Sequence, residues 1–258
     1  MSLFSAGESR WIERLGSLRT VVRQEVISRQ LAGYVRRGVL DVGCGQGTQA
    51  LRLAARGAVV TGVDPSSDLL ARFAADAARA GLRAELIEGA IGTLPEVLAD
   101  RRFDLVCAHG LLMYLDDRAG AIATLRSRLT PRGRLSFTFR NGHALAMRPG
   151  LRRDWARAIE AFDAVSYVNE LGLAATADRL EEVADDLAAA GLRIVEWFGV
   201  RVFNDAIAVE VTAEDEDLAG LLDAEELAGR RDPYRWLASQ FHVIAEPLPG
   251  LECGPAPG

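Results

Sequence analysis

The sequence predicts an α/β protein built on a mostly parallel sheet, and two observations carry this prediction. Short apolar or β-branched runs recur along the chain, at 39–42, 59–63, 84–87, 103–108, 134–139, 192–203 and 241–245. Segments whose apolar residues recur every three or four positions lie between most of them, which is typical of amphipathic helices. Because strands that alternate with helices form βαβ units, we expect most of these seven strands to lie parallel in one sheet.

The first helices follow from apolar spacing and from turn residues. A stripe at three- and four-residue steps predicts a helix over 11–35, and its members are Trp11, Leu15, Leu18, Val22 and Val26. A second helix is expected at about 48–56. The polar turn Asp64-Pro65-Ser66 ends the second strand and begins a third helix, since a polar residue or proline commonly starts one.

The alternation continues as far as residue 141 and then breaks. We expect a helix near 118–129 and a turn at Pro131-Arg132-Gly133 before the fifth strand. Beyond Asn141, residues 151–165 and 176–190 read as two helices with no strand between them. An acidic helical stretch separates the last two strands, and the Pro- and Gly-rich tail is expected to be loose.

Composition excludes several classes of protein. The chain has 258 residues and a formal net charge of −6, and all of its 30 basic residues are arginine. An acidic chain argues against non-specific nucleic-acid binding, which depends on neutralising phosphates. The three cysteines, Cys44, Cys107 and Cys253, have no metal-ligand or disulfide spacing, so we expect no metal and a reducing cytoplasm. No apolar run is long enough for a signal or membrane segment.

The clearest functional motif is a glycine loop between the first strand and the next helix. It reads Asp41-Val42-Gly43-Cys44-Gly45-Gln46-Gly47. Glycines without a Cβ let a ligand approach the backbone closely. The spacing is GxGxG, which differs from the GxGxxG of dinucleotide folds and lacks the GK[ST] of a phosphate loop.

An acid at the end of the second strand sharpens this motif. Asp64 stands where a carboxylate can accept both ribose hydroxyls of an adenosine. Together, the loop and Asp64 resemble the S-adenosyl-L-methionine (SAM) site of the Rossmann-like class I methyltransferases. The alternatives are an ordinary tight turn with an incidental aspartate, or NAD binding.

Five further segments resemble one family, the bacterial tRNA carboxymethoxyuridine methyltransferases of the CmoM/SmtA type. They are VVRQ at 21–24, FRNGH at 139–143, GVRVFND at 199–205, DPY at 232–234 and FHV at 241–243. The resemblance covers most of residues 11–246. It implies a seven-stranded sheet with helices on both faces, the last strand antiparallel, and an inserted helical cap.

The resemblance also implies a division of the chain. Residues 1–35 would form an N-terminal helical lid, 36–140 the SAM-binding core, and 141–190 a helical insert facing the substrate. Residues 191–246 would complete the core, and 247–258 would be the loose tail. The lid and the insert would cover the SAM pocket.

Cofactor contacts are implied residue by residue. Arg23 would pair with the methionine carboxylate, and Asp64 would hold the ribose. His109 would face the sulfonium end. The loop would contribute Asp41, Gly43, Cys44, Gly45 and Gly47, and the adenine would lie between Ala90 and Ile91. Arg23 could instead be a solvated helix charge, and His109 an ordinary strand-end histidine.

On the acceptor side, the residues favour an anion. A carboxylate is already ionised at neutral pH, so it needs a cationic anchor and no general base. Arg201 lies in an otherwise apolar run, where a charge needs a partner, and we predict that it is this anchor. Its alternative is a structural ion pair with Asp205 or another acid. Asn141 and His143 follow the fifth strand, near the ligand-binding edge of an open sheet.

His143 has two interpretations, and the acceptor has three. The histidine is either a general base for a hydroxyl or amine acceptor or an exposed loop residue. A basic patch in 140–157 could grip tRNA, yet 205–226 is strongly acidic and 165–170 lacks the lysines of the family. The activity is therefore expected to be O-methylation of a small-molecule carboxylate or hydroxyl. The alternatives are a tRNA wobble carboxylate and a non-catalytic SAM-binding regulator, and the oligomeric state is left open.

Overall fold

The structure is a computed structural model that describes residues 16–169, 171–208, 210–214 and 217–249. Its residues group into two compact units, which we name after their most distinctive feature. The glycine-loop unit comprises Tyr34–Phe137, Glu181–Glu196 and Val243–Gly258. The arginine unit comprises Met1–Gly33, Thr138–Leu180 and Trp197–His242.

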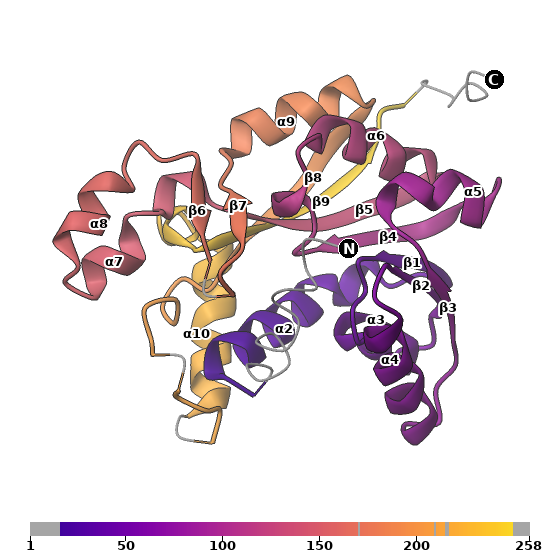
Figure 1. Cartoon of the computed structure of the whole chain (residues 1–258), viewed down its shortest axis with the longest axis horizontal. Coiled ribbons are helices and arrows are strands. Elements are labelled where there is room, and N and C mark those ends of the chain that lie inside the picture. The colour runs from indigo at the N-terminus through magenta and orange to yellow at the C-terminus, as the bar shows by residue number, and fades with distance from the viewer. Residues whose placement is uncertain (1–15, 170, 209, 215–216, 250–258) are drawn as a thin grey trace. The chain divides into compact units, whose positions relative to one another are not determined.

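A seven-stranded sheet confirms the predicted fold class. Its strand order is β3-β2-β1-β4-β5-β9-β8 (Figure 1). The strands are β1 (Gly38–Val42), β2 (Val59–Asp64), β3 (Ala84–Glu88), β4 (Phe103–His109), β5 (Leu129–Arg140), β8 (Leu192–Val200) and β9 (Gln240–Pro247). Each β-branched run found in the sequence is one of these strands.

The strands around the glycine loop are parallel. β1 pairs with β2 on one side and with β4 on the other, so that Asp41 lies opposite Gly62 and Cys107. β9 runs against β8, because Ser239 donates its N–H to Arg201 O while Leu248 donates to Gly191 O. The last strand is therefore antiparallel, as expected, and the carboxyl ends of β1, β2 and β4 share one edge.

Helices cover both faces of the sheet in the glycine-loop unit. They are α3 (Thr48–Ala55), α4 (Ser67–Arg79), α5 (Leu94–Leu98), α6 (Arg118–Ser127) and most of α9 (Leu180–Ala189). Helices α3 and α4 lie on one side, and α5, α6 and α9 on the other (Figure 1). Ser66 caps α4 by accepting from Leu69 N, as the turn residues predicted. The sequence did not predict the short helix α5.

The arginine unit contains more regular structure than expected. It holds α2 (Leu18–Leu31), α7 (Met147–Leu151), α8 (Trp155–Glu160), α10 (Leu218–Arg230) and a hairpin of β6 (Ser166–Val168) with β7 (Ala174–Thr176). Four aromatic rings pack edge to face, and they belong to Phe139, Trp197, Trp236 and Phe241. The two phenylalanines are buried and the two tryptophans are half-buried. Edge-to-face pairs stabilise a fold beyond the area that they bury.

Three expectations about local structure were wrong. Pro131–Gly133 is no turn, because β5 runs through it from Leu129, and Gly133 lies so close to Phe103 O that a Cβ there would meet it at 2.9 Å. The helix over 151–165 is broken into α7 and α8 near Arg153, whose φ is +62°. A strand pair, β6–β7, separates the insert helices where none was expected.

The strand predicted at 192–203 is shorter than expected. β8 ends at Val200 and does not continue to Phe203, because Arg201 has a φ of +61°. A left-handed residue takes the chain out of the extended conformation that a strand needs. Residues 11–15 of the first predicted helix and 250–258 of the predicted tail lie outside the described residues.

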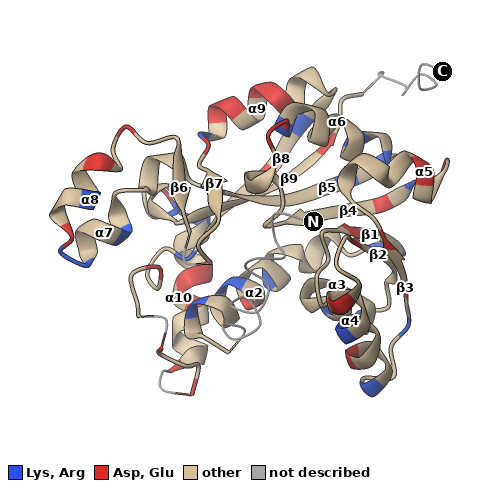
Figure 2. Cartoon of the chain, in the orientation of Figure 1, with Lys and Arg blue, Asp and Glu red and all other residues tan. Residues whose placement is uncertain are grey.

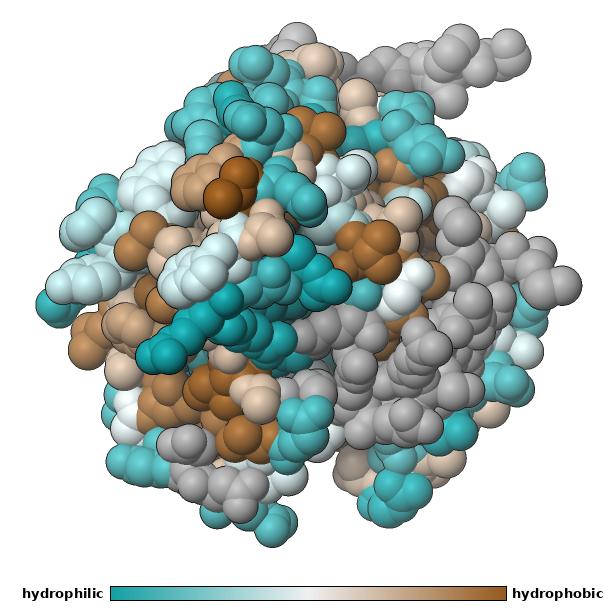
Figure 3. All heavy atoms as spheres, turned by 60° about the vertical axis from the view of Figure 1, so that its left-hand side comes forward, coloured by the Kyte–Doolittle hydropathy of each residue, from teal (hydrophilic) through white to brown (hydrophobic). Residues whose placement is uncertain are grey.

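The insert exposes large apolar side chains. Large apolar side chains on and after α7 and α8 are more than half exposed, namely Leu151, Trp155, Ile159, Phe162, Val165 and Val168. Brown hydrophobic patches lie among hydrophilic ones when this side comes forward (Figure 3). Helix α9 carries a row of acidic side chains (Figure 2). None of the helices in the described part of the chain has the length and apolar character needed to cross a membrane.

Candidate functional site

The glycine loop has the backbone shape that only glycine adopts easily. Gly43, Gly45 and Gly47 have φ values of +68°, +52° and +80°. Gly47 is also the N-cap of α3, and a Cβ there would meet the Phe73 ring at 2.5 Å. Both the conformation and the space therefore require a glycine at this position. The result is a tight turn with three residues that lack side chains, at the carboxyl end of β1 on the ligand-binding edge of the sheet.

Asp64 holds this loop in place. Its Oδ2 accepts from Gly45 N at 2.8 Å, and its Oδ1 accepts from Ser66 N at 2.9 Å. The residue is only 7% exposed. Burial raises the pKa of Asp64, while the two backbone hydrogen bonds oppose the rise. A carboxylate oxygen accepts two hydrogen bonds, so each oxygen keeps a site for a ribose hydroxyl.

Asp41 is buried on β1, one strand away from Asp64. Burial, together with the charge of Asp64, raises the pKa of Asp41 to about 7. Two carboxylates this close to each other do not both ionise easily. The electrostatics therefore favour a ligand that brings hydroxyl donors or positive charge to this end of the sheet.

The remaining predicted contacts of the glycine-loop unit lie at the ends of β3 and β4. Ala90 precedes the 3-10 turn Ile91–Thr93 and is exposed, while Ile91 is half-buried. His109 ends β4, and its Nε2 is 2.8 Å from Ser136 Oγ. The structure thus brings the loop, Asp64, Ala90, Ile91 and His109 to the carboxyl ends of four neighbouring parallel strands.

Neither buried cysteine in the described chain has a reactive environment. Cys44 lies in the loop and Cys107 on β4, and burial raises the pKa of both thiols well above the usual range. A thiol that stays protonated is a poor nucleophile. Within the described residues, no group of three or more His, Cys, Asp or Glu could hold a metal ion.

Arg23 belongs to the arginine unit and lies on α2. Its Nε donates to Gln240 Oε1 at 2.9 Å, and its Nη2 is 3.5 Å from Thr138 Oγ1. The guanidinium is therefore held toward the ends of β5 and β9. This agrees with a fixed side chain and not with a solvated helix charge.

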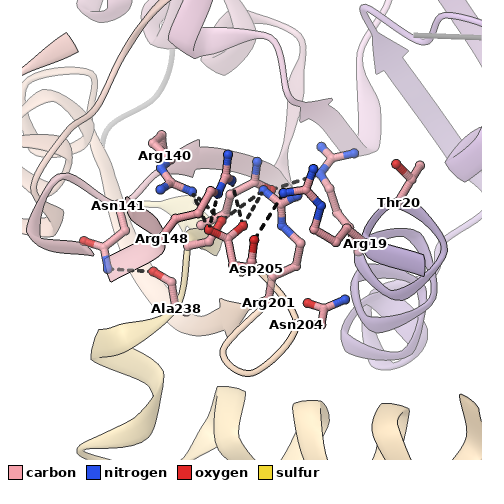
Figure 4. Close-up of polar contacts among 12 residues, drawn as sticks. Arg19, Thr20, Arg140, Asn141, Arg148, Arg201, Asn204, Asp205 and Ala238 are labelled. Atoms are coloured by element: carbon pink, nitrogen blue, oxygen red, sulfur yellow. Dashed lines mark hydrogen bonds and ion pairs between the residues drawn. The ribbon is translucent and has the colours of Figure 1, made fainter. Parts of the chain in front are cut away.

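Arg201 lies in a group of charged residues that we call the arginine cluster: Arg140, Arg148 and Arg201 around Asp205 (Figure 4). Arg148 donates to both Asp205 oxygens, from Nε and from Nη2, at 2.8 Å each. Arg201 Nη2 is 3.3 Å and Arg140 Nη1 3.5 Å from the same carboxylate. The ion pair of Arg201 with Asp205, which the sequence left as an alternative, is thus present.

The arginine cluster contains more positive than negative side chains. Three guanidiniums surround one carboxylate, and the pKa of Asp205 lies well below its usual value because of Arg201, Arg140 and Arg148, although burial opposes this. Burial lowers the pKa of Arg201 to about 10, so the group stays protonated at neutral pH. The cluster keeps a positive charge that an anion could neutralise.

The loop that carries Arg201 is held by a residue that sequence reasoning missed. Glu225 on α10 is fully buried and accepts from three successive backbone N–H groups, those of Val202, Phe203 and Asn204, at 2.7, 3.0 and 2.9 Å. Ser239 N donates to Arg201 O. These contacts stabilise the left-handed backbone of Arg201, which costs an L residue about 1–3 kcal/mol.

Other members of the cluster gave only a weak signal in the sequence. Arg140 ends the apolar run of β5, and Arg148 belonged to the basic patch expected on the surface. The structure buries Arg140 and pairs both residues with Asp205. A charged residue at the end of an apolar strand was the sign that could have identified Arg140.

Asn141 and His143 differ in their surroundings. Asn141 is buried, its Nδ2 donates to Trp236 O and Ala238 O, and its Oδ1 accepts from His143 N. All of these bonds go to backbone, so Asn141 fixes the chain after β5. The His143 side chain is exposed, as one of its two interpretations required.

The glycine-loop residues fit a nucleoside cofactor that carries no phosphate. Three left-handed glycines form the tight turn after β1, and the Asp64 carboxylate beside Gly45 keeps acceptor capacity for hydroxyl donors. The two buried carboxylates, Asp41 and Asp64, favour hydroxyl donors over phosphate, which would be repelled. SAM has ribose hydroxyls and a cationic sulfonium, whereas NAD has a pyrophosphate.

The comparisons with known proteins agree with this site. Residues 39–133 match the family described as a methyltransferase domain. The chain is 30% identical over 243 residues to the tRNA 5-carboxymethoxyuridine methyltransferase of Escherichia coli K12, with 89% of this chain and 88% of that protein covered. It is also 30% identical over 140 residues to a ubiquinone biosynthesis O-methyltransferase of Pasteurella multocida, with 51% and 56% covered.

Solved structures show the same fold. Magnesium protoporphyrin IX methyltransferase from Synechocystis PCC 6803, with bound SAH, matches with a TM-score of 0.62 and 16% identity over 93% of this chain and 94% of that one. The CcbJ methyltransferase of Streptomyces caelestis matches with a TM-score of 0.60 and 16% identity, over 88% and 95%. The chain belongs to the class I S-adenosyl-L-methionine-dependent methyltransferases, in the family that includes the tRNA 5-carboxymethoxyuridine methyltransferases.

Proposed function

We propose that this methyltransferase forms a methyl ester on a carboxylate of a small-molecule acceptor, with Arg201 as the anchor of that carboxylate. The observation that carries the proposal is the buried positive charge of the arginine cluster, in which Asp205 is the one carboxylate that the three guanidiniums share. Arginine binds a carboxylate through two parallel hydrogen bonds and therefore orients it as well as attracting it.

The cofactor site of the proposal is the glycine loop. Gly43, Gly45 and Gly47 would line it, Asp64 would accept from the ribose hydroxyls, and Ala90 with Ile91 would flank the adenine. Arg23 would pair with the methionine carboxylate, and His109 would lie near the sulfonium. SAM supplies an activated methyl group, so that an O–CH₃ bond forms as the S–CH₃ bond breaks and the sulfonium becomes a neutral thioether.

The residues of the protein need only bind and orient a carboxylate acceptor. A carboxylate acceptor is ionised at pH 7, so no side chain has to remove a proton from it. Arg201 binds and orients it, which is how much of the rate of such a displacement can arise. A hydroxyl acceptor would need a base, and the exposed His143 is our candidate for that variant of the reaction.

A small acceptor is favoured over tRNA because several arginines of the insert are bound within the protein. Arg140 is buried and Arg148 pairs with Asp205, so the insert offers few cations to a phosphate backbone. Arg152 donates to the carbonyls of Ala206 and Ile207. Helix α9 is acidic on its exposed side, which repels nucleic acid.

The tRNA wobble carboxylate is our second candidate, because the relative from Escherichia coli is a tRNA 5-carboxymethoxyuridine methyltransferase and is similar over most of both chains. Its acceptor would also be a carboxylate, so the anchor would be the same. Both candidate acceptors, a small acid and tRNA, are found in the cytoplasm, where we expect the protein.

A labelled-methyl assay tests the proposal. The purified protein is incubated with methyl-labelled SAM and either total tRNA or a panel of carboxylic and hydroxy acids. Methyl esters are recognised because mild alkali releases the label as methanol. We expect alkali-labile label on a small acid and at least a tenfold lower turnover in Arg201→Gln, with SAM affinity nearly unchanged.

The exposed Arg157 gives a matched control, because Arg157→Gln removes an equal charge from the surface of the insert. The proposal is rejected if label enters only alkali-stable products, or if Arg157→Gln lowers turnover as much as Arg201→Gln. Label on tRNA alone would select the second candidate.

A further inference from the structure

One carboxylate, that of Asp205, is contacted by three guanidiniums. Arg148 donates to both of its oxygens at 2.8 Å, in the bidentate geometry that is the strongest arrangement for this pair. Arg201 and Arg140 lie at 3.3 and 3.5 Å from the same carboxylate, longer than a charge-assisted hydrogen bond of about 2.8 Å.

Arg140 and Arg201 rely on the same neutral group. Both donate to the hydroxyl oxygen of Ser239, Arg140 from Nη1 at 2.5 Å and Arg201 from Nη2 at 2.9 Å. The Nε atom of each is buried and has no hydrogen-bond partner. Arg140 is 3% exposed. A hydroxyl can accept a hydrogen bond but brings no charge, so Asp205, and for Arg201 also the buried Glu225, supplies the compensation. Two carboxylates thus act on three guanidiniums, and the cluster keeps a positive charge.

A third buried group on the same loop also lacks partners. Asn204, between Arg201 and Asp205, is fully buried, and neither its Oδ1 nor its Nδ2 forms a hydrogen bond. Figure 4 shows it on the loop that carries Arg201 and Asp205. An unpartnered buried amide costs about 1–3 kcal/mol, and native proteins keep few of them. Such a group is typical of a site that is completed by a ligand.

Part of the cluster is accessible from the surface. The side chains of Arg201 and Arg148 remain 13% and 17% exposed, so the cluster reaches the surface on their side. Arg201 is fixed by Glu225 and Ser239, as described above, and Arg140 stacks over the Tyr167 ring at 5.4 Å. The donors are therefore held in place before the ligand arrives.

We propose that the arginine cluster binds two negative charges of the acceptor, the reacting carboxylate at Arg201 and a second oxyanion at Arg140. The inference rests on the proposed function and narrows it, because the acceptor becomes a dianion. Its second group is either another carboxylate or a phosphate, since both present the oxygens that a guanidinium binds.

Binding of simple anions tests this inference without any methyl transfer. The full chain is titrated by calorimetry, at constant ionic strength, with acetate, with malonate, succinate and glutarate, and with inorganic phosphate. We expect at least one dicarboxylate or phosphate to bind ten times more tightly than acetate. The dicarboxylate and phosphate titrations distinguish the two sources of the second oxyanion.

Variants assign the effect to the cluster. Arg140→Gln should reduce dianion affinity to the level of acetate, while Arg157→Gln should leave it unchanged. Asn204→Asp guards against loss of folding, because it adds a buried negative charge to the loop that carries Arg201. We expect Asn204→Asp to raise the melting temperature at low salt and to abolish the preference for dianions.

Equal affinity for acetate and for every dianion would overturn the inference, as would an equal loss in Arg140→Gln and Arg157→Gln. The labelled-methyl assay separates this failure from that of the proposed function. If monocarboxylic acids are methylated as efficiently as dianions, the binding of a second oxyanion is rejected and the proposed function stands. If the protein binds dianions selectively but forms no methyl ester on any acid, the proposed function is rejected and the anion site stands.

Discussion

Arg148 binds both carboxylate oxygens of Asp205, and the guanidiniums of Arg140 and Arg201 lie beside the same carboxylate. Because three guanidiniums contact one carboxylate, the group keeps a positive charge. The contact also withdraws Arg148 from the insert surface, where the sequence suggested a nucleic-acid patch.

Asp205→Asn should destabilise the protein by about 3–5 kcal/mol, because it removes a buried charge that three guanidiniums contact. Urea unfolding at pH 7 measures this. Asp76→Asn is the matched control, since Asp76 pairs with Arg79 on the surface of α4 and such pairs contribute about 1 kcal/mol or less. Equal losses in the two variants would contradict the importance of the cluster.

The contribution of Asp205 should also depend on pH. Its pKa is lowered well below the usual value in the folded state, so the native protein stays ionised where the unfolded chain takes up a proton. The stabilisation is complete above the unfolded pKa of about 4 and is lost as the pH falls toward the folded pKa. The difference in unfolding free energy between the wild type and Asp205→Asn should therefore shrink from pH 6 to pH 3; a constant difference would exclude this coupling.

Asp41 should show the opposite pH dependence. Its pKa is raised to about 7 in the folded state, so the native protein keeps a proton that the unfolded chain loses above about pH 4. Stability is consequently lost as the pH rises toward 7, by up to about 4 kcal/mol. Asp41→Asn should be more stable relative to the wild type at pH 8 than at pH 4.5. Thermal unfolding at the two pH values checks this, and an unchanged difference would refute it.

Asp64→Ala should weaken binding of S-adenosylhomocysteine by at least about 3 kcal/mol, or roughly 100-fold, because two hydrogen bonds to a charged group are lost and the support of Gly45 is lost with them. Calorimetry with the purified protein measures it. Asp68→Asn, on an exposed residue in the first turn of α4, removes the same charge from the surface and should leave the affinity unchanged. Unaltered affinity in Asp64→Ala would reject the ribose assignment.

Gly47→Ala should destabilise the protein by about 2 kcal/mol or more, since alanine is strained at a φ of +80° and its Cβ would lie 2.5 Å from the Phe73 ring. The variant Phe73→Leu makes room for that methyl group. The free energy of unfolding lost in the double variant should therefore be smaller than the sum of the losses in the two single variants, as unfolding in urea would show. Full additivity would mean that backbone strain alone makes this glycine necessary.

The sequence by itself determined the sheet, the glycine loop and Asp64. These depend on local information: β-branched runs, helical spacing, and glycines whose conformation other residues avoid. The motif lies within one strand–turn–helix unit and the next strand, so its members are neighbours in the chain as well as in space. For this reason the cofactor class followed from a short stretch of residues.

Tertiary structure alone decided the arginine cluster. Arg140, Arg148 and Asp205 are far apart in the chain or belong to different elements, and a charged residue carries no local sign of the partner it will find. The support that Glu225 gives to Arg201 was missed for the same reason. Pairing between distant segments depends on how the chain packs, and the energy of a buried charge depends on neighbours that sequence spacing does not reveal.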